Sequence, residues 1–183
     1  MSLADKLTSI RIILIPVFIS FLIYSTSKPM LRLFAVGVFV IAILSDFFDG
    51  LVARMKKEKS EYGQVLDPLA DKLLMLTAFI SLYLLPQFKV YLWLVLIVVS
   101  RDIILFLGVI VLHFLKIEVT ITPSIWGKLT TFFQMFTVLW ILVGLDGYFF
   151  ICVLAAVFTL ISGIDYLSRG VKEINVNINS HTN

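Results

Sequence analysis

Charged residues, cysteine and histidine are all scarce in this sequence. Only 15% of the 183 residues are charged, whereas 60% are hydrophobic. Soluble domains carry about 25% charged residues, so the composition excludes that class and indicates a membrane protein. Cys152 is the only cysteine, which excludes an intrachain disulfide. The two histidines, His113 and His181, lie far apart in the sequence, so no cluster of thiolates and imidazoles suited to zinc is present.

Long apolar stretches divide the chain into predicted transmembrane helices. Crossing a bilayer takes about 20 apolar residues, and the sequence offers six such stretches, at 9–24, 31–55, 67–85, 90–115, 125–143 and 148–168. The first stretch is predicted to be a retained span, because no small-residue cleavage site follows it. Since the connections are short, we predict an all-α, polytopic integral membrane protein with a single domain at 1–172. An Asn-rich tail at 173–183 is predicted to be disordered.

Basic residues near the ends of these stretches predict the orientation. Cytoplasmic connections of membrane proteins carry an excess of Lys and Arg. With the N-terminus inside, the inner basic residues are Lys6, Arg11, Arg54, Lys56, Lys57, Lys59, Lys116, Lys128, Arg169 and Lys172, and the outer ones are Lys28, Arg32 and Lys89. Both termini are therefore expected in the cytoplasm of a bacterial-type inner membrane. The basic residues form no continuous face, so no nucleic-acid partner is expected.

Four aspartates, Asp46, Asp49, Asp67 and Asp71, interrupt the apolar sequence. Each carboxylate at membrane depth costs about 3 kcal/mol, so a cluster of four predicts a compensating cation. Spacings of three and four place each pair on one face of its helix. The two helices are expected to be antiparallel and to direct all four carboxylates into one cavity in the cytoplasmic half. Oxygen ligands at this density favour Mg²⁺, Mn²⁺ or Ca²⁺.

Small residues and an arginine accompany the aspartates. Gly50 and Ala53 share the helix face of the first pair, and Gly63 precedes the second pair. Small side chains allow a ligand or a neighbouring backbone to approach closely. Arg54 follows at the predicted membrane edge, where a guanidinium can bind phosphate through two hydrogen bonds. Together with a divalent metal, these residues predict a pyrophosphate site.

These residues form one continuous pattern, whose members are Asp46, Asp49, Gly50, Ala53, Arg54, Gly63, Asp67 and Asp71. The pattern resembles the full signature of the CDP-alcohol phosphatidyltransferase family. The six-span layout, KLTSIRIILIPVF at 6–18, SRD at 100–102 and GKLTTFFQ at 127–134 are similar to the branch of phosphatidylglycerophosphate and cardiolipin synthases. One departure is Asp5, at a position where that branch often has asparagine.

The resemblance implies that an acceptor hydroxyl attacks the lipid-linked phosphorus of CDP-diacylglycerol and that CMP leaves. It implies metal ligation, by Mg²⁺ or Mn²⁺, at Asp46, Asp49, Asp67 and Asp71, with Asp71 as a ligand or as the catalytic base. The nucleotide would be bound by Asp46, Gly50, Ala53, Arg54, Gly63 and Thr8. A homodimer is also implied by the resemblance alone.

The acceptor site is predicted at Arg101, Lys128 and Arg11. A guanidinium in mid-membrane needs a carboxylate or an anionic substrate, so internal pairing of Arg101 with Asp102 or Asp165 is the alternative. Lys128 alone could instead reach lipid headgroups. Glycerol 3-phosphate is the preferred acceptor, and phosphatidylglycerol, inositol phosphate and serine remain open. A cation or proton transporter is the non-enzymatic alternative, but it would spread polar residues between both membrane faces.

Overall fold

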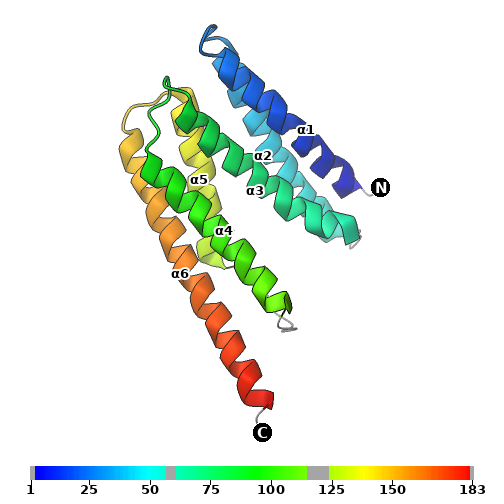
Figure 1. The fold of residues 1–183 in the computed structure, drawn as a ribbon. Helices are drawn as coiled ribbons and strands as arrows, with labels where there is room; N and C mark the ends of the chain where they lie inside the picture. The colour runs from blue at the N-terminus through cyan, green and yellow to red at the C-terminus, as the bar shows by residue number, and fades with distance from the viewer. Residues whose placement is uncertain (1–2, 57–60, 115–123, 182–183) are drawn as a thin grey trace. The chain divides into compact units, whose positions relative to one another are not determined.

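The structure is a computed structural model whose backbone describes residues 3–56, 61–114 and 124–181, with side chains described at 9–45, 70, 72–108, 110 and 124–172. This part of the chain folds into six helices, drawn in Figure 1: α1 (Leu3–Tyr24), α2 (Leu31–Lys56), α3 (Glu61–Leu84), α4 (Leu92–Phe114), α5 (Ile125–Val143) and α6 (Tyr148–His181). The all-α prediction is confirmed.

Two helix bounds differ from the predictions in a way that matters for the site. α3 begins at Glu61 and not at Asp67, because its first turn is polar and a search for apolar stretches does not count it. α6 continues through His181, past Lys172, where the disordered tail was predicted to begin. No glycine or proline follows Gly170 in the sequence, so no strong helix breaker stands there. The single-domain prediction for 1–172 stays a prediction.

Two helices of the described part are long and apolar enough to cross a membrane. They are Ile125–Val143 in α5 and Tyr148–Lys172 in α6. Shorter apolar helices occur at Ser9–Tyr24, Leu31–Ser45 and Lys72–Leu84. Large apolar side chains are also exposed on the surface; Leu33, for example, is 71% exposed. Apolar exposure on this scale suits a surface in contact with lipid and not with water.

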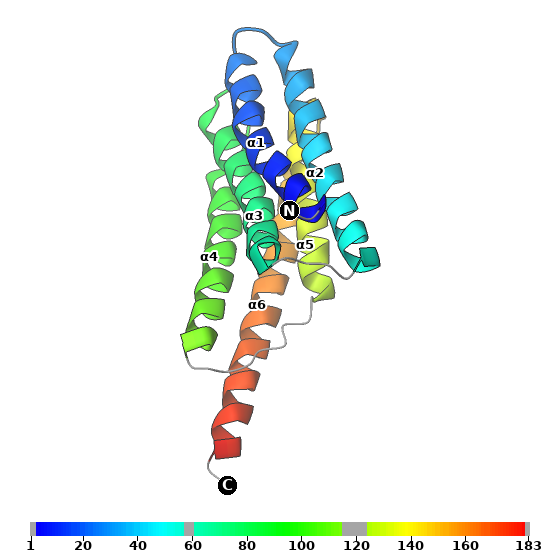
Figure 2. The same cartoon turned by 90° about the vertical axis from the view of Figure 1, so that its right-hand side faces the viewer.

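The chain divides into two compact units. The first comprises residues 1–90 and 138–145, and the second comprises residues 91–137 and 146–183. In the first unit, α1 packs against both α2 and α3, as Figure 2 shows. The rings of Phe18 and Phe39 meet at 5.4 Å between their centroids, and Phe79 is fully buried. These contacts join the two helices that carry the aspartate motif to a common partner, α1.

The C-terminus of α5 belongs to the first unit and ends in a glycine-dependent turn. Gly144 has φ of +81°, a conformation that side chains other than glycine disfavour. Its N–H donates to the carbonyl of Ile141 at 3.1 Å, and the N–H of Leu145 donates to the carbonyl of Trp140 at 3.3 Å. This pair of bonds is the Schellman motif, which satisfies helix carbonyls that would otherwise lack donors.

Arg32, in the first turn of α2, reinforces this helix end. Its Nε donates to the carbonyl of Leu142 at 2.5 Å, and its Nη2 donates to the carbonyl of Ile141 at 2.8 Å. The guanidinium carbon lies 5.1 Å from the centroid of the Phe88 ring, in a cation–π geometry. A cation at a helix C-terminus also complements the helix dipole. Arg32 thereby fixes the last turn of α5 against α2.

In the second unit, buried polar side chains of α5 donate hydrogen bonds that join this helix to α6. The Thr130 hydroxyl donates to the carbonyl of Phe158 at 2.7 Å, and the Gln134 amide donates to the Thr159 hydroxyl at 3.0 Å. Thr130 and Thr159 are fully buried, and Gln134 is nearly so. Polar groups between apolar helices hold the helices together, because hydrocarbon offers them no other partner. We call Thr130, Gln134, Phe158 and Thr159 the polar seam.

An aromatic cluster marks one end of the second unit. Tyr91 precedes α4 and stacks with Trp93 and with Tyr148, the first residue of α6, at centroid distances of 5.7 and 6.0 Å. Phe149 packs edge-on against Tyr91 at 5.5 Å. The helices α4 and α6 therefore begin at the same end of this unit.

Candidate functional site

The aspartate motif lies on two helices of the first unit. α2 carries Asp46 and Asp49 within continuous helix, and α3 carries Asp67 and Asp71 in the same way. The backbone is helical at all four positions, and that one face is shared by each pair stays a prediction. The side chains of the motif aspartates lie outside the described residues.

The remaining motif residues occupy the same two helices. Gly50, Ala53 and Arg54 lie on α2, and Gly63 lies on α3, now inside the helix because α3 starts at Glu61. Thr8, like these residues, has a described backbone position, in α1, but no described side chain. Their assignment to the nucleotide therefore stays a prediction.

Arg11, on α1, is fully buried within the first unit. α1 packs against both motif helices, so this predicted substrate-binding cation belongs to the same unit as the aspartates. Burial of a guanidinium requires hydrogen-bonding partners or a bound anion. Its position on α1 is compatible with the predicted contact to substrate phosphate.

Arg101, on α4, is a buried residue of the predicted acceptor site and forms two side-chain hydrogen bonds. It is 9% exposed, and its Nη1 donates to Oδ1 of Asp102 at 2.8 Å. Its Nη2 donates to Oγ of Ser162, on α6, at 2.7 Å. Its Nε finds no hydrogen-bond partner among the described residues. Internal pairing with Asp102, the alternative considered above, is thus present in the structure.

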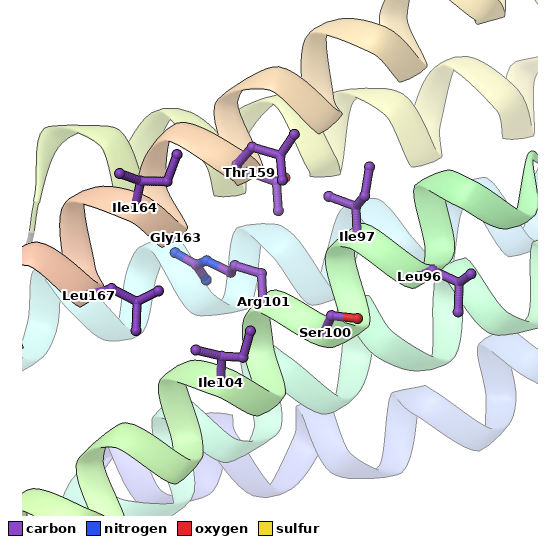
Figure 3. A pocket seen from close by; sticks show the side chains of 10 residues that line it. Leu96, Ile97, Ser100, Arg101, Ile104, Thr159, Gly163, Ile164 and Leu167 are labelled. Atoms are coloured by element: carbon purple, nitrogen blue, oxygen red, sulfur yellow. The ribbon is translucent and has the colours of Figure 1, made fainter.

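A cavity of about 300 Å³ lies beside Arg101, between α4 and α6. Figure 3 shows its side chains converging from the two helices. The residues that line it are Leu96, Ile97, Ser100, Arg101, Ile104, Thr159, Leu160, Gly163, Ile164 and Leu167. Its walls are therefore mostly apolar, with one guanidinium among them. This combination suits a ligand that has an apolar part and a hydrogen-bond acceptor.

Lys128 lies in the first turn of α5 and is exposed. The residue before this helix, Ser124, caps it by accepting a hydrogen bond from the N–H of Trp126 at 3.2 Å. The Ser124 hydroxyl donates to Oδ2 of Asp165 at 2.5 Å, and Arg169 donates to the other oxygen of Asp165 at 3.1 Å. Asp165 is thus paired with Arg169 and Ser124, and among the described side chains its predicted alternative pairing with Arg101 is not present.

The predicted site residues fall into different units. The motif helices and Arg11 belong to the first unit, whereas Arg101 and Lys128 belong to the second. Their meeting in one cavity stays a prediction. Ser162 and Ser124 were missed from the sequence, because a lone serine in an apolar helix or before a helix carries no signal of which side chain it will contact.

The family model for CDP-alcohol phosphatidyltransferase matches residues 1–162. The chain therefore belongs to the CDP-alcohol phosphatidyltransferase family. This membership, together with the two long apolar helices, identifies it as a membrane protein.

Relatives that match most of the chain carry closely related names. A probable phosphatidylglycerophosphate synthase of Mycobacterium tuberculosis is 33% identical over 180 residues, covering 94% of this chain and 83% of the relative. A CDP-diacylglycerol–glycerol-3-phosphate 3-phosphatidyltransferase of Rickettsia bellii is 33% identical over 181 residues, covering 93% and 96%. The protein of the same name from Aquifex aeolicus is 29% identical over 182 residues, covering 95% and 98%.

Proposed function

We propose that this protein transfers the phosphatidyl group of CDP-diacylglycerol to glycerol 3-phosphate, which makes it a phosphatidylglycerophosphate synthase. The observation that carries the proposal is the complete eight-residue motif on α2 and α3, the helices that both pack against α1. The names of the relatives from Mycobacterium tuberculosis, Rickettsia bellii and Aquifex aeolicus agree with this activity and acceptor.

The donor set of the motif fits a hard divalent cation. Four carboxylates, from Asp46, Asp49, Asp67 and Asp71, are oxygen ligands of the kind that Mg²⁺ and Mn²⁺ prefer. When bound, such a cation neutralises charge on the pyrophosphate and on the departing CMP. Residues of α2 and α3 would hold the nucleotide beside it, with Gly50, Ala53 and Gly63 leaving room and Arg54 and Thr8 binding phosphate oxygens.

The reaction is a substitution at phosphorus. The acceptor hydroxyl forms a new P–O bond to the phosphorus that bears diacylglycerol, and the bond from that phosphorus to the bridging oxygen of CMP breaks. The electron pair of the broken bond leaves with CMP. Asp71 is proposed to take the hydroxyl proton, a role that requires it to lie within hydrogen-bonding distance of that hydroxyl.

Cationic side chains are proposed to bind the acceptor. Arg101 has five N–H groups and uses two of them on Asp102 and Ser162. Nε is buried, so the second N–H groups of Nη1 and Nη2 are the ones proposed to donate to a phosphate group, for which a planar guanidinium is well suited. Lys128, exposed at the start of α5, and the buried Arg11 are proposed to supply further positive charge.

The membrane arrangement is also part of the proposal. All six helices are proposed to span a bacterial-type inner membrane, with both termini in the cytoplasm, in keeping with the excess of Lys and Arg predicted on that side. This orientation places the aspartates within reach of water-soluble glycerol 3-phosphate and of the released CMP. The functional protein is proposed to be a homodimer.

The proposal is tested by incubating the purified protein with CDP-diacylglycerol, Mg²⁺ and each candidate acceptor separately, while CMP and the lipid product are measured. Glycerol 3-phosphate is expected to support CMP release, and Asp67→Asn is expected to lower the rate by at least about a hundredfold. Asp146→Asn removes the same charge in the loop before α6 and is the matched control, expected to retain activity. Full activity of Asp67→Asn, or activity without any divalent cation, would contradict the mechanism.

A second acceptor, phosphatidylglycerol, is favoured by one observation. The cavity beside Arg101 has mostly apolar walls, which a lipid acceptor could use for an acyl chain and glycerol 3-phosphate could not. The product would then be cardiolipin. Product formation with phosphatidylglycerol and none with glycerol 3-phosphate would reverse the order of the two candidates.

A further inference from the structure

Arg101 is held by two acceptors that come from two different helices. Asp102 is its neighbour on α4 and accepts from Nη1, whereas Ser162 on α6 accepts from Nη2. Ser162 is 2% exposed and is not one of the residues that line the cavity beside Arg101. Any effect of Ser162 on binding must therefore act through the side chain that it contacts.

Two glycines, Gly127 and Gly163, lie beside the contact between Arg101 and Ser162. A Cβ placed on Gly127 would lie 3.9 Å from both Arg101 Nη2 and Ser162 Oγ, and a Cβ on Gly163 would lie 3.6 Å from Arg101 Cγ. Glycines from α5 and α6 thus let the guanidinium lie close to two helix backbones. A bulky side chain at either position would compete with Arg101 for this space.

Two anchored nitrogens fix the plane of a guanidinium. An unanchored Arg side chain has about 2 kcal/mol of rotamer entropy to lose when it binds a ligand. Anchoring Nη1 and Nη2 removes most of that freedom in advance and leaves the second N–H group of each of these nitrogens for a ligand, whereas Nε is buried. The two anchors differ in charge. The Asp102 carboxylate repels an anionic ligand, whereas the neutral Ser162 hydroxyl orients Arg101 without such repulsion.

We propose that Ser162 is a positioning residue for the acceptor: its hydroxyl on α6 aims the Arg101 guanidinium at the phosphate of the acceptor substrate. The inference rests on the proposed function, in which Arg101 binds that phosphate. It adds that the acceptor site depends on α6 through a residue that never touches the substrate.

The experiment measures steady-state kinetics of the full-length protein in lipid nanodiscs, varying glycerol 3-phosphate and CDP-diacylglycerol in turn, together with calorimetric binding of glycerol 3-phosphate. Ser162→Ala is expected to raise the acceptor KM and Kd about tenfold, as for loss of one hydrogen bond to a charged group. Its kcat and its KM for CDP-diacylglycerol are expected to stay within about twofold. A merely structural defect would instead lower kcat and affect both substrates.

Two comparisons decide the outcome. Thr137→Ala removes another buried hydroxyl from the same unit, one bonded to the Phe133 carbonyl at 2.7 Å, and is expected to leave the acceptor KM unchanged. In an Arg101→Ala background, Ser162→Ala is expected to have no further effect, because the two residues act as one. Additive effects of the two substitutions, or an equal effect of Thr137→Ala, would overturn the inference.

Failure of the proposed function gives a different pattern. A wild-type protein that neither binds nor uses glycerol 3-phosphate contradicts the function before any variant is tested. An Arg101→Ala variant with unchanged acceptor KM overturns the role of Arg101, and the inference with it. A raised acceptor KM in Arg101→Ala combined with an unchanged one in Ser162→Ala overturns the inference alone.

Discussion

Gly144→Ala is expected to destabilise the protein far more than the same substitution at Gly147. Both glycines lie in the turn between α5 and α6 with positive φ, +81° and +75°. Alanine in this conformation costs about 1 kcal/mol. At Gly147 nothing lies within 4 Å of the added Cβ, so this cost is the whole effect. At Gly144 the Cβ would lie 2.6 Å from Nη2 of Arg32, so the guanidinium must move.

Moving that guanidinium weakens the bonds that hold the end of α5. The bonds at stake are those from Arg32 to the carbonyls of Leu142 and Ile141. A hydrogen bond to a charged group contributes about 2 kcal/mol net. Losing one of the two raises the expected cost of Gly144→Ala to about 3 kcal/mol. For a protein of this size, 1 kcal/mol lowers Tm by about 3 °C, so the expected shifts are about 9 °C for Gly144→Ala and about 3 °C for Gly147→Ala.

The only cysteine of the chain provides the assay. Cys152 is fully buried in α6, so a fluorogenic maleimide reacts with it only on unfolding. Melting curves of the detergent-solubilised protein then give Tm for each variant. In an Arg32→Ala background, Gly144→Ala should cost only about 3 °C more, because the displaced side chain is gone. Equal shifts for the two glycine variants, or an undiminished shift in that background, would refute the reasoning.

Further predictions concern a helix cap, the polar seam and the metal. Ser124→Ala should lower stability by about 1 kcal/mol, since it removes both the α5 cap and the bond to Asp165; a Tm equal to wild type would contradict this. Gln134→Leu should cost less than Gln134→Ala, because leucine fills the buried volume, whereas alanine loses packing as well as the bond to Thr159; the reverse order in melting curves would count against it. Chelation by EDTA should abolish CMP release and added Mg²⁺ should restore it, whereas activity in EDTA would exclude a metal-dependent mechanism.

The helices could be predicted from the sequence because each of them contains a long apolar stretch. The fifth stretch, 125–143, has the same bounds as α5. The start of α3 could not be predicted, because Glu61 opens a polar turn that hydropathy alone does not identify as helix. The extension of α6 to His181 was missed for a similar reason, since a polar composition was interpreted as disorder.

Some features of the candidate site could be predicted from the sequence and others could not. The motif aspartates have a fixed spacing within two helices, so local periodicity predicts one shared face for each pair, and this stays a prediction. The partners of Arg101 lie at different distances along the chain. Asp102 is adjacent and was considered from the sequence, whereas Ser162 is 61 residues away and depends on how α4 packs against α6. Such a contact is set by tertiary packing, which one sequence does not reveal.

The polar seam also determines how α5 and α6 align lengthwise. A slip of one helical turn, about 5.4 Å, would carry Gln134 away from the Thr159 hydroxyl and Thr130 away from the Phe158 carbonyl. In hydrocarbon no water could replace either partner. Apolar surfaces alone would tolerate several alignments at similar energy, so these few hydrogen bonds select one. The polar seam thus fixes the position of Lys128 along the axis of α5 relative to the position of Ser162 along the axis of α6.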